Sequence, residues 1–251
     1  MKQAMIFAAG LGTRLRPLTN DRPKALVEVA GKTLLEHNLL KLKAAGFDHI
    51  VINVHHFAEK IYDFLAAHDH FGMRIAVSDE RDLLLDTGGG IRRALSLLDP
   101  ASPVLIHNVD IISDIDVAAL YEAHLHRVVK RNGANEPVVA TLAVNRRSTS
   151  RYLMMDEAQC LCGWTNVQTG EVRGRMGEKY AFAGIHVIDP GLFPTLLEQR
   201  EEVFPIVPFY LSCCDRVAIH GVDVTESAWV DCGKVESLRR AEEIVENQRE
   251  L

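Results

Sequence analysis

The sequence predicts an α/β fold in which a Rossmann-like, mixed and mainly parallel sheet is flanked by helices and extended by a small antiparallel lobe. Two patterns predict this class. In the first half of the 251-residue chain, apolar segments of strand length alternate with longer segments of helical periodicity. Beyond about residue 135, short apolar runs are separated by turns rich in glycine, threonine and asparagine, which favours antiparallel or mixed strands.

The first half has the pattern of a βαβ series. Because its strands are apolar throughout and separated by helices, we expect a parallel sheet that is covered on both faces. Ligands of such sheets bind beyond the carboxyl ends of the strands, so the loops after Ala9, Ser78 and Asn108 are expected to carry the chemistry. Strands are expected at residues 4–9, 49–55, 74–79 and 103–109, and helices at 33–46, 57–68 and 89–99.

The first of these helices has sequence signals at both ends. Thr33 and Glu36 fit the S/T-x-x-E capping box, in which the first side chain accepts a hydrogen bond from an unpaired backbone N–H group. Gly46 supplies a natural end. In the second half, strands are expected at 138–144, 151–155 and 181–189, and an amphipathic helix at 237–251 should pack back on the main body.

Composition excludes several classes of protein. The chain is 47% hydrophobic and 25% charged, which is enough apolar material for a substantial core and excludes a disordered tail. Its net charge of -6 has the wrong sign for gripping nucleic acid. No apolar run reaches the roughly 18 residues of a membrane span, and the N-terminus lacks the pattern of a signal peptide. We therefore expect a cytoplasmic protein with neither a nucleic-acid nor a membrane partner.

Cysteines and histidines do not indicate a structural metal site. The five cysteines are odd in number and form no C-x-x-C pair, so reduced, mostly packed thiols are expected. The closely spaced histidine pairs have no matching cluster of cysteines or carboxylates, and two helical residues at i and i+2 do not share a face. These pairs are His55 and His56, His68 and His70, and His124 and His126.

A glycine loop directly after the first strand is the strongest chemical signal. Gly10 and Gly12 allow backbone N–H groups to turn inward and form an anion-binding nest, although a plain tight turn would use the same residues. A Rossmann fingerprint would need a third glycine where Leu15 stands, and a phosphate-binding Walker loop would need glycine at Leu26. The cations that follow could fold over a triphosphate or remain solvated; they are Arg14, Arg16 and Lys24.

The segment GLGTRLRPLTNDRPKALVEVAGKTLL resembles the signature of the sugar-1-phosphate nucleotidyltransferases, members of the GT-A-like nucleotidyltransferase superfamily. The resemblance continues through LLLDTGGGIRRAL, LIHNVDII, AFAGIHVIDP and WVDCGKVESLRRAE, and so covers nearly the whole chain. Among the branches of the family, the chain most resembles the compact hexose 1-phosphate and N-acetylmuramate 1-phosphate types, and the leading candidates are the mannose-1-phosphate guanylyltransferases and the N-acetylmuramate-1-phosphate uridylyltransferases. A single domain spanning 1–251 is implied, with a nucleotide-binding part at about 1–134, a sugar-phosphate-binding part at about 135–233 and a C-terminal helix at 234–251.

The resemblance implies an enzyme that uses Mg²⁺ and transfers a nucleotidyl group from a nucleoside triphosphate to a sugar 1-phosphate, giving a nucleotide sugar and pyrophosphate. Such products are precursors of cell-wall or surface polysaccharides. Two alternatives stay open: a cytidylyltransferase acting on phosphocholine, and a catalytically silent regulatory member that binds nucleotide sugars. A homodimer is expected only on base rates.

The resemblance also assigns residues. Arg14, Lys24 and Asp110 would be catalytic, and Asp110 and Asp231 would hold Mg²⁺. Without the resemblance, Asp110 could equally be a cap and Asp231 a turn residue. The nucleotide would contact Ala8, Ala9, Gly10, Leu11, Gly12, Thr13, Arg14, Lys24, Glu80, Thr87, Gly88, Gly89 and Asn108, with Asp86 as a further candidate. The sugar phosphate would contact Gly163, Asn166, Glu178 and Gly184, with Trp164 near the opposite wall.

Two positions depart from the family pattern. Val109 replaces the glycine before the metal aspartate, and a β-branched residue does not easily adopt a positive φ, so the backbone there should differ slightly. Lys234 replaces the threonine of the D-x-G-T motif, where it could either approach a phosphate or face solvent.

Overall fold

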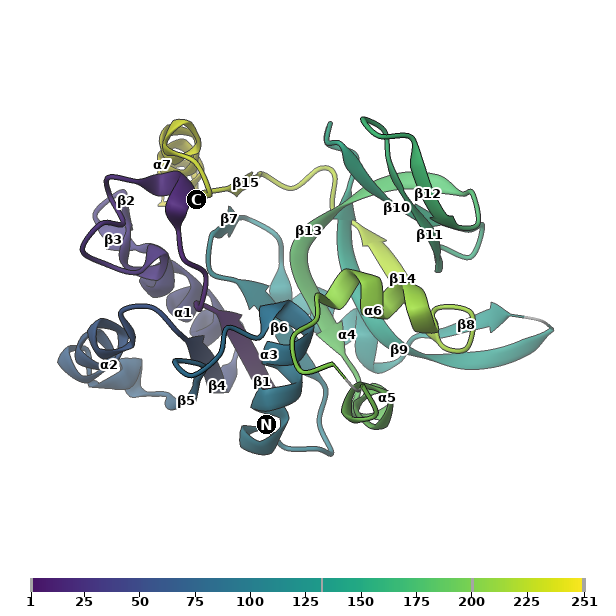
Figure 1. Ribbon diagram of the computed structural model, residues 1–251, viewed down its shortest axis with the longest axis horizontal. Helices are drawn as coiled ribbons and strands as arrows, with labels where there is room; N and C mark the ends of the chain where they lie inside the picture. Colours follow the sequence, from purple (N-terminus) through teal and green to yellow (C-terminus); the bar gives the residue numbers. More distant parts are fainter. Residues whose placement is uncertain (1, 132, 200, 250–251) are drawn as a thin grey trace.

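The computed structural model describes residues 2–131, 133–199 and 201–249 (Figure 1). Its main sheet confirms the predicted class. Four strands run parallel in the order β5 (Arg74–Asp79), β4 (Phe47–Val54), β1 (Lys2–Phe7) and β6 (Val104–Asn108). Next to β6, the strand β13 (Glu178–Ile188) runs antiparallel and joins the second half of the chain to the same sheet.

The second half adds a branched, largely antiparallel extension. β13 pairs with both β9 (Ala134–Asn145) and β10 (Arg151–Met155). β10 leads through β11 (Leu161–Asn166) to the edge strand β12 (Glu171–Gly174), and β9 also pairs with β8 (Val128–Arg131) and β14 (Ala218–Asp223). Two short ladders lie apart from this sheet: β2 (Glu28–Val29) with β3 (Lys32–Thr33), and β7 (Ile111–Ser113) with β15 (Trp229–Asp231).

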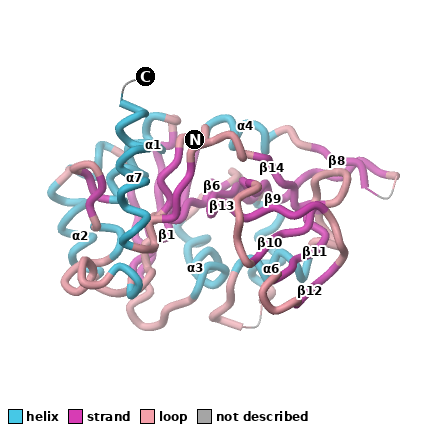
Figure 2. Tube along the Cα trace, turned by 90° about the horizontal axis from the view of Figure 1, so that it is seen from above, coloured by secondary structure: helices cyan, strands magenta, loops and turns pink. Residues whose placement is uncertain are grey.

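Helices cover both faces of the sheet, as Figure 2 shows with α1 and α4 on one side and α3 and α6 on the other. Thr33 caps the first helix as expected, because its hydroxyl accepts a hydrogen bond from the Glu36 N–H at 3.1 Å. The helices are α1 (Leu34–Ala44), α2 (Ala58–Ala67), α3 (Asp86–Ala94), α4 (Val117–Leu125), α5 (Phe193–Leu197), α6 (Ile206–Cys213) and α7 (Val235–Arg249). None of these described helices combines the length and apolar character that crossing a bilayer requires.

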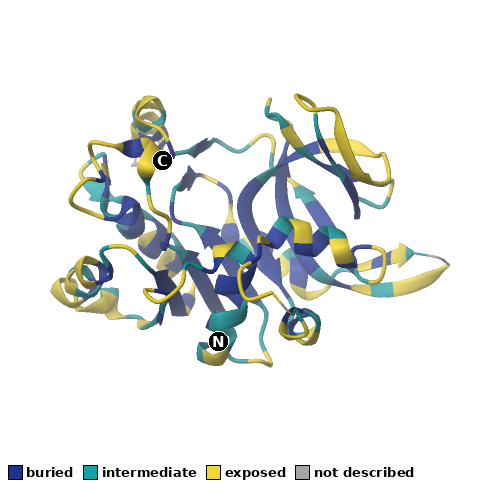
Figure 3. Ribbon diagram, in the orientation of Figure 1, coloured by how far each residue is buried: buried dark blue, intermediate teal, exposed yellow. Residues whose placement is uncertain are grey.

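Two hydrophobic cores lie on the two faces of the sheet, because successive residues of a strand point to opposite sides. In β1, Ala4 and Ile6 belong to one core with α1, α2 and α7, whereas Met5 belongs to the other with α3 and α6. Figure 3 shows the buried strands between exposed helix surfaces, and the exposed β12 at the outer edge. The C-terminal helix packs on the first core through buried residues such as Ile244, as the amphipathic pattern predicted. Residues 250 and 251 of the expected helix lie outside the described residues.

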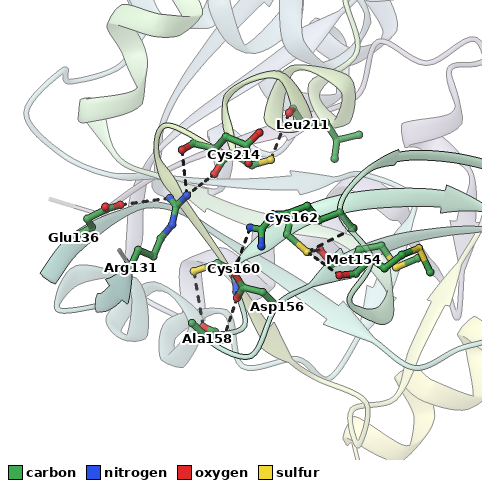
Figure 4. Close-up of polar contacts among 12 residues, drawn as sticks. Arg131, Glu136, Met154, Asp156, Ala158, Cys160, Cys162, Leu211 and Cys214 are labelled. Carbon is green, nitrogen blue, oxygen red and sulfur yellow. Dashed lines mark hydrogen bonds and ion pairs between the residues drawn. The ribbon is translucent and has the colours of Figure 1, made fainter. Parts of the chain in front are cut away.

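All five cysteines are free and buried, which confirms the expectation of packed thiols. Three of them lie close together in the part of the fold formed by the second half of the chain, and the thiol of each donates to a backbone carbonyl oxygen (Figure 4). They are Cys160, Cys162 and Cys214. Burial raises the pKa of Cys160 to about 11 and that of Cys232 to about 12. At neutral pH these thiols are protonated and therefore poor nucleophiles.

Two histidines are buried on opposite faces of the sheet where β6 meets β13. His107 and His186 are each 1% exposed. Burial lowers the pKa of His107 to about 4 and that of His186 to about 3, and Lys41 and His107 respectively add a smaller repulsion in the same direction. Both rings are neutral in the folded protein at pH 7 and take up protons on unfolding below their ordinary pKa of about 6.5.

Lowering the pH from 7 to 5 should therefore destabilise the protein by about 2 kcal/mol for each of these histidines. The stabilisation is complete above pH 6.5 and is lost as the pH falls towards the folded-state values. In a His186→Leu variant, the difference in free energy of unfolding between pH 7 and pH 5 should shrink by about 2 kcal/mol. Urea titrations at both pH values measure this, with exposed His70→Gln as control; an unchanged difference in His186→Leu would contradict the expectation.

Candidate active site

A cavity of 380 Å³ lies at the carboxyl edge of the parallel strands, where the sequence pattern predicted the chemistry. Its walls come from the residues that end or follow all four strands, together with Lys24 and the start of α3. Of the residues expected to bind nucleotide or metal, the cavity lining contains Ala8, Ala9, Gly10, Lys24, Glu80, Thr87, Asn108 and Asp110, and also Asp86.

The glycine loop after β1 leaves backbone donors free. Gly12 has a left-handed φ of 63°, and its carbonyl oxygen accepts hydrogen bonds from the Leu15 N–H at 2.9 Å and the Thr19 hydroxyl at 2.8 Å. No hydrogen bond within the described chain engages the N–H groups of Gly10 and Leu11. These donors, beside a cavity, suit an anion such as a phosphate.

Gly12 also packs against the lysine of the cavity. A Cβ atom at Gly12 would come within 3.1 Å of the Lys24 Cβ and 3.0 Å of the Thr19 methyl carbon. The loop can pass this close only without a side chain, and a non-glycine residue would additionally be strained at this φ. The glycine therefore allows the loop to pack closely against the lysine side chain.

Lys24 and Asp110 both line the cavity and form an ion pair there. The two residues are 86 positions apart in the chain, and the Lys24 Nζ donates to the Asp110 Oδ2. The side chains are 11% and 17% exposed, so solvent screens this pair much less than a surface pair. Asp110 follows β6 directly and stands where a parallel sheet presents ligand-binding groups.

Asp231 lies beside this pair because of the β7–β15 ladder. Asp231 stands opposite Ile111, and the Cys232 N–H donates to the Asp110 carbonyl oxygen at 2.8 Å. Burial and then the negative charge of Asp110 raise the pKa of Asp231, while Lys24 and Arg14 act in the opposite direction. The resemblance placed these two carboxylates together although more than a hundred residues separate them, and the ladder provides the geometric reason.

The arginine of the glycine loop approaches the same carboxylate. A Cβ atom built on Gly233 would lie 2.6 Å from an Arg14 guanidinium nitrogen and 2.7 Å from an Asp231 carboxylate oxygen. The Gly233 N–H donates to that oxygen at 2.7 Å. Arg14 is exposed, and its guanidinium group lies beside Asp231, outside the cavity lining.

The two aspartates fit a magnesium ion. Mg²⁺ prefers oxygen ligands and is commonly held by one or two carboxylates together with substrate phosphates. Here two carboxylates converge closely enough for one to raise the pKa of the other, a repulsion that a divalent cation would relieve. Groups of three or more histidine, cysteine or carboxylate side chains suited to a metal are absent from the described part of the chain.

Asn53 and Glu80 form a buried polar link that sequence reasoning found only in part. The Asn53 Oδ1 accepts a hydrogen bond from the Ala8 N–H, and its Nδ2 donates to the Glu80 carboxylate, both at 2.8 Å. Glu80 is fully buried, and its other oxygen accepts from the Leu85 N–H at 3.2 Å. Burial raises the pKa of Glu80 despite these hydrogen bonds. The link thus joins the glycine loop to the loop before α3.

The turn at the start of α3 is held by the second half of the chain. The N–H groups of Gly88 and Gly89 both donate to the Phe204 carbonyl oxygen, at 2.8 and 3.1 Å, and the Thr87 hydroxyl accepts from the Ile206 N–H at 2.9 Å. A Cβ atom on Gly88 would come within 2.3 Å of the Phe204 ring. These two glycines lie outside the cavity lining, and the space they leave is filled by the 202–204 segment.

On the expected sugar side, one of four residues lies next to the cavity. Gly184 has a left-handed φ of 77°, and a Cβ atom there would be 2.9 Å from the side-chain nitrogen of Asn108, which lines the cavity. The other three and Trp164 lie outside the lining. Gly163 pairs with Gly174 between β11 and β12, Asn166 accepts from Gln168 in the hairpin turn, and Glu178 pairs with Arg146 at 2.7 Å beside a separate hollow.

The two departures from the family pattern have local explanations. Val109 is buried and is absent from the described residues with positive φ, so the backbone accommodates a β-branched residue there. Its N–H donates to the Phe7 carbonyl oxygen at 3.2 Å, and its carbonyl oxygen accepts from the Asn38 side chain at 3.0 Å. Lys234 is exposed, which agrees with the solvent-facing alternative.

The sequence interpretation did not single out three residues near this site. Asn53 was detectable in principle, as a polar residue that interrupts the apolar run 50–54 in the second half of β4. Phe204 carries no local signal, because its role depends on glycines more than a hundred residues earlier. Arg147 follows β9 in a polar run, with nothing in its sequence context to distinguish it from Arg146.

The fold and these charges define an α/β protein with a cleft built to bind anions. The chain belongs to the nucleotidyl transferase family, whose profile matches residues 3–248. An N-acetylmuramate alpha-1-phosphate uridylyltransferase of Caulobacter vibrioides is 56% identical over 113 residues, 44% of this chain and 46% of that protein. A mannose-1-phosphate guanylyltransferase catalytic subunit beta of Drosophila pseudoobscura pseudoobscura is 29% identical over 240 residues, 92% of this chain and 59% of that protein.

The aligned regions thus span about half the length of these curated relatives. A solved UDP-glucose pyrophosphorylase in complex with UDP-glucose superposes with a TM-score of 0.75 over 99% of this chain and 100% of its own. Its sequence identity is 16%, so this similarity shows a shared fold.

Proposed function

We propose that this protein transfers a nucleotidyl group from a nucleoside triphosphate to a sugar 1-phosphate, with release of pyrophosphate and with Mg²⁺ as cofactor. The observation that carries the proposal is the convergence of four charged residues: Lys24 and Asp110 line the cavity, and Asp231 and Arg14 lie beside them. Cations are needed to bind and neutralise two phosphate-bearing substrates, and one or two carboxylates commonly hold the Mg²⁺ that accompanies the phosphates.

The reaction is an in-line displacement. A phosphate oxygen of the acceptor attacks the α-phosphorus of the triphosphate, the bond to the β-phosphate oxygen breaks, and pyrophosphate leaves with that electron pair. The free N–H groups of the glycine loop bind the triphosphate, while Lys24 and Arg14 offset its charge and the charge of the transition state. Mg²⁺ held by Asp110 and Asp231 would supply further neutralisation of the phosphates.

Two substrate pairs have specific support. The local identity of 56% to the uridylyltransferase favours UTP with N-acetylmuramate 1-phosphate, whose product is a cell-wall precursor. The weaker but longer similarity to the guanylyltransferase subunit favours GTP with mannose 1-phosphate. The homodimer and the cytoplasmic location inferred from the sequence, the phosphocholine acceptor and the silent regulatory member are further hypotheses.

Pyrophosphate release provides the test. ATP, CTP, GTP, UTP and dTTP are crossed with the 1-phosphates of glucose, mannose, N-acetylglucosamine and N-acetylmuramate and with phosphocholine, in the presence of Mg²⁺. We expect one strong pair, with UTP and N-acetylmuramate 1-phosphate first, and loss of its signal with EDTA. A folded protein that binds a nucleotide but turns over no pair would contradict the proposal and favour the regulatory alternative.

A further inference from the structure

A local break in β13 forms a wall beside the cavity. The ladder between β13 and β9 is interrupted between Phe182 and His186, around the left-handed Gly184. Two side chains hold the carbonyl groups at this break. The Arg147 Nη2 donates to the Phe182 oxygen at 2.9 Å, and the Trp229 Nε1 donates to the Ala183 oxygen at 2.8 Å. Since Gly184 contacts Asn108, this wall adjoins the cavity.

Arg147 packs on Trp229, which belongs to the same strand as Asp231, an expected metal ligand. The centre of its guanidinium group lies 4.4 Å from the centroid of the Trp229 ring. Trp229 and Asp231 are two residues apart in β15 and so point to the same face of that strand, about 7 Å apart along it. Consistent with this, Asp231 is the principal charge acting on Arg147, and it opposes the lowering of the Arg147 pKa by burial.

The guanidinium group has unused hydrogen-bonding capacity. The Arg147 Nε is buried and has no hydrogen-bond partner, and no carboxylate within the described ranges lies within 4.0 Å of the group. The neighbouring Arg146 differs, since it forms ion pairs with Glu178 at 2.7 Å and Asp223 at 3.4 Å. A half-buried cation without a counterion is costly unless an anion joins it.

We propose that Arg147 binds the phosphate group of the acceptor, the sugar 1-phosphate, an inference that rests on the proposed function. Arg14 and Lys24 lie beside the glycine loop, where the triphosphate is expected. The incoming acceptor is a second anion, and it needs a cation of its own. Arg147 is that cation: stacking on Trp229 and the bond to Phe182 fix its planar group, and its Nη1, which makes no hydrogen bond within the described chain, can donate to a phosphate.

The test compares Arg147→Gln with Arg146→Gln, a change of charge at the adjacent position. With the strongest substrate pair, Arg147→Gln should raise the KM of the acceptor by about 10- to 100-fold, as expected for the loss of a charge-assisted hydrogen bond. The KM of the nucleotide should change less than about threefold, and Arg146→Gln should leave both values within about twofold. An unchanged acceptor KM in Arg147→Gln, or an equal rise in both KM values, would overturn the proposal.

A second variant, Arg147→Lys, and a binding measurement test the proposal even if Arg147→Gln does not fold or no turnover is detected. If thermal melting shows Arg147→Gln to be unfolded, Arg147→Lys should still raise the acceptor KM alone, because lysine keeps the charge but loses the planar fork. With the nucleotide of the strongest substrate pair bound and Mg²⁺ absent, so that the glycine loop is occupied, calorimetric binding of inorganic phosphate should be about tenfold weaker in Arg147→Gln than in wild type and Arg146→Gln. Equal phosphate affinities would refute the Arg147 site, whereas absence of turnover in the wild type would refute only the proposed reaction.

Discussion

Replacing Asp110 with asparagine is expected to lower the rate of pyrophosphate release by about a thousandfold while the protein stays folded. The change removes one of two carboxylates at the expected metal site and the partner of Lys24 in the cavity. Asparagine keeps the shape of the side chain but carries no charge. The site should therefore bind a cation more weakly, and the Lys24 amino group should be held less firmly in place. The rate is measured as pyrophosphate release at saturating Mg²⁺ with the strongest substrate pair.

Stability measurements separate this effect from misfolding. Lys24 keeps a second carboxylate nearby in Asp231, so Asp110→Asn should cost about 1 to 3 kcal/mol of unfolding free energy. Asp114→Asn serves as the matched control, because Asp114 is an exposed carboxylate just past β7. It should retain near-normal rates. Full activity in folded Asp110→Asn protein would remove Asp110 from the mechanism.

Lys24→Ala is expected to have two effects of opposite sign. The turnover rate should fall by about two to three powers of ten, because a charge-assisted contact to the triphosphate worth about 2 to 4 kcal/mol is lost. The affinity for Mg²⁺ without nucleotide should rise, by about tenfold, because Lys24 otherwise neutralises Asp110. Two carboxylates left without the lysine repel each other and attract a divalent cation more strongly.

Turnover assays and calorimetric titration with MgCl₂ alone measure the two effects on the same preparations. Arg22→Ala provides the control from the same segment, since Arg22 is exposed and pairs with its neighbour Asp21 at 3.1 Å. It should change neither quantity by more than about twofold. A normal rate in Lys24→Ala would exclude the lysine from catalysis, and unchanged Mg²⁺ affinity would show that it does not compete with the metal ion.

The fold was predictable where its signals are local. Hydrophobic periodicity located the parallel strands and α1 to α3, and the capping residues located the start of α1, because these depend on neighbours in sequence. For the hairpin of β11 and β12, the sequence predicted only turns. Its edge strand β12 is exposed throughout, so it lacks the alternation that identifies a strand.

The candidate site was predictable at the glycine loop and at Asp110, which follow strands directly. The positions of the expected sugar-side residues were not, because they depend on pairings between distant segments. Gly163 is glycine since the Arg175 carbonyl oxygen would lie 2.2 Å from a Cβ there, a close approach within the hairpin that looks the same in sequence as a ligand contact. Gly88 is glycine for a similar reason, its neighbour being Phe204.

The bonds that tie the turn at the start of α3 to Phe204 and Ile206 limit how far the specificity of this protein can be changed for one substrate at a time. The turn lies on the expected nucleobase side of the cavity, whereas its supports belong to the half that should receive the sugar. A transplant of residues 86–89 alone would remove the Thr87 hydroxyl that accepts from the Ile206 N–H and would place new side chains against the Phe204 ring. Grafting a new base preference into this protein would therefore require residues 202–206 to be exchanged together with the turn.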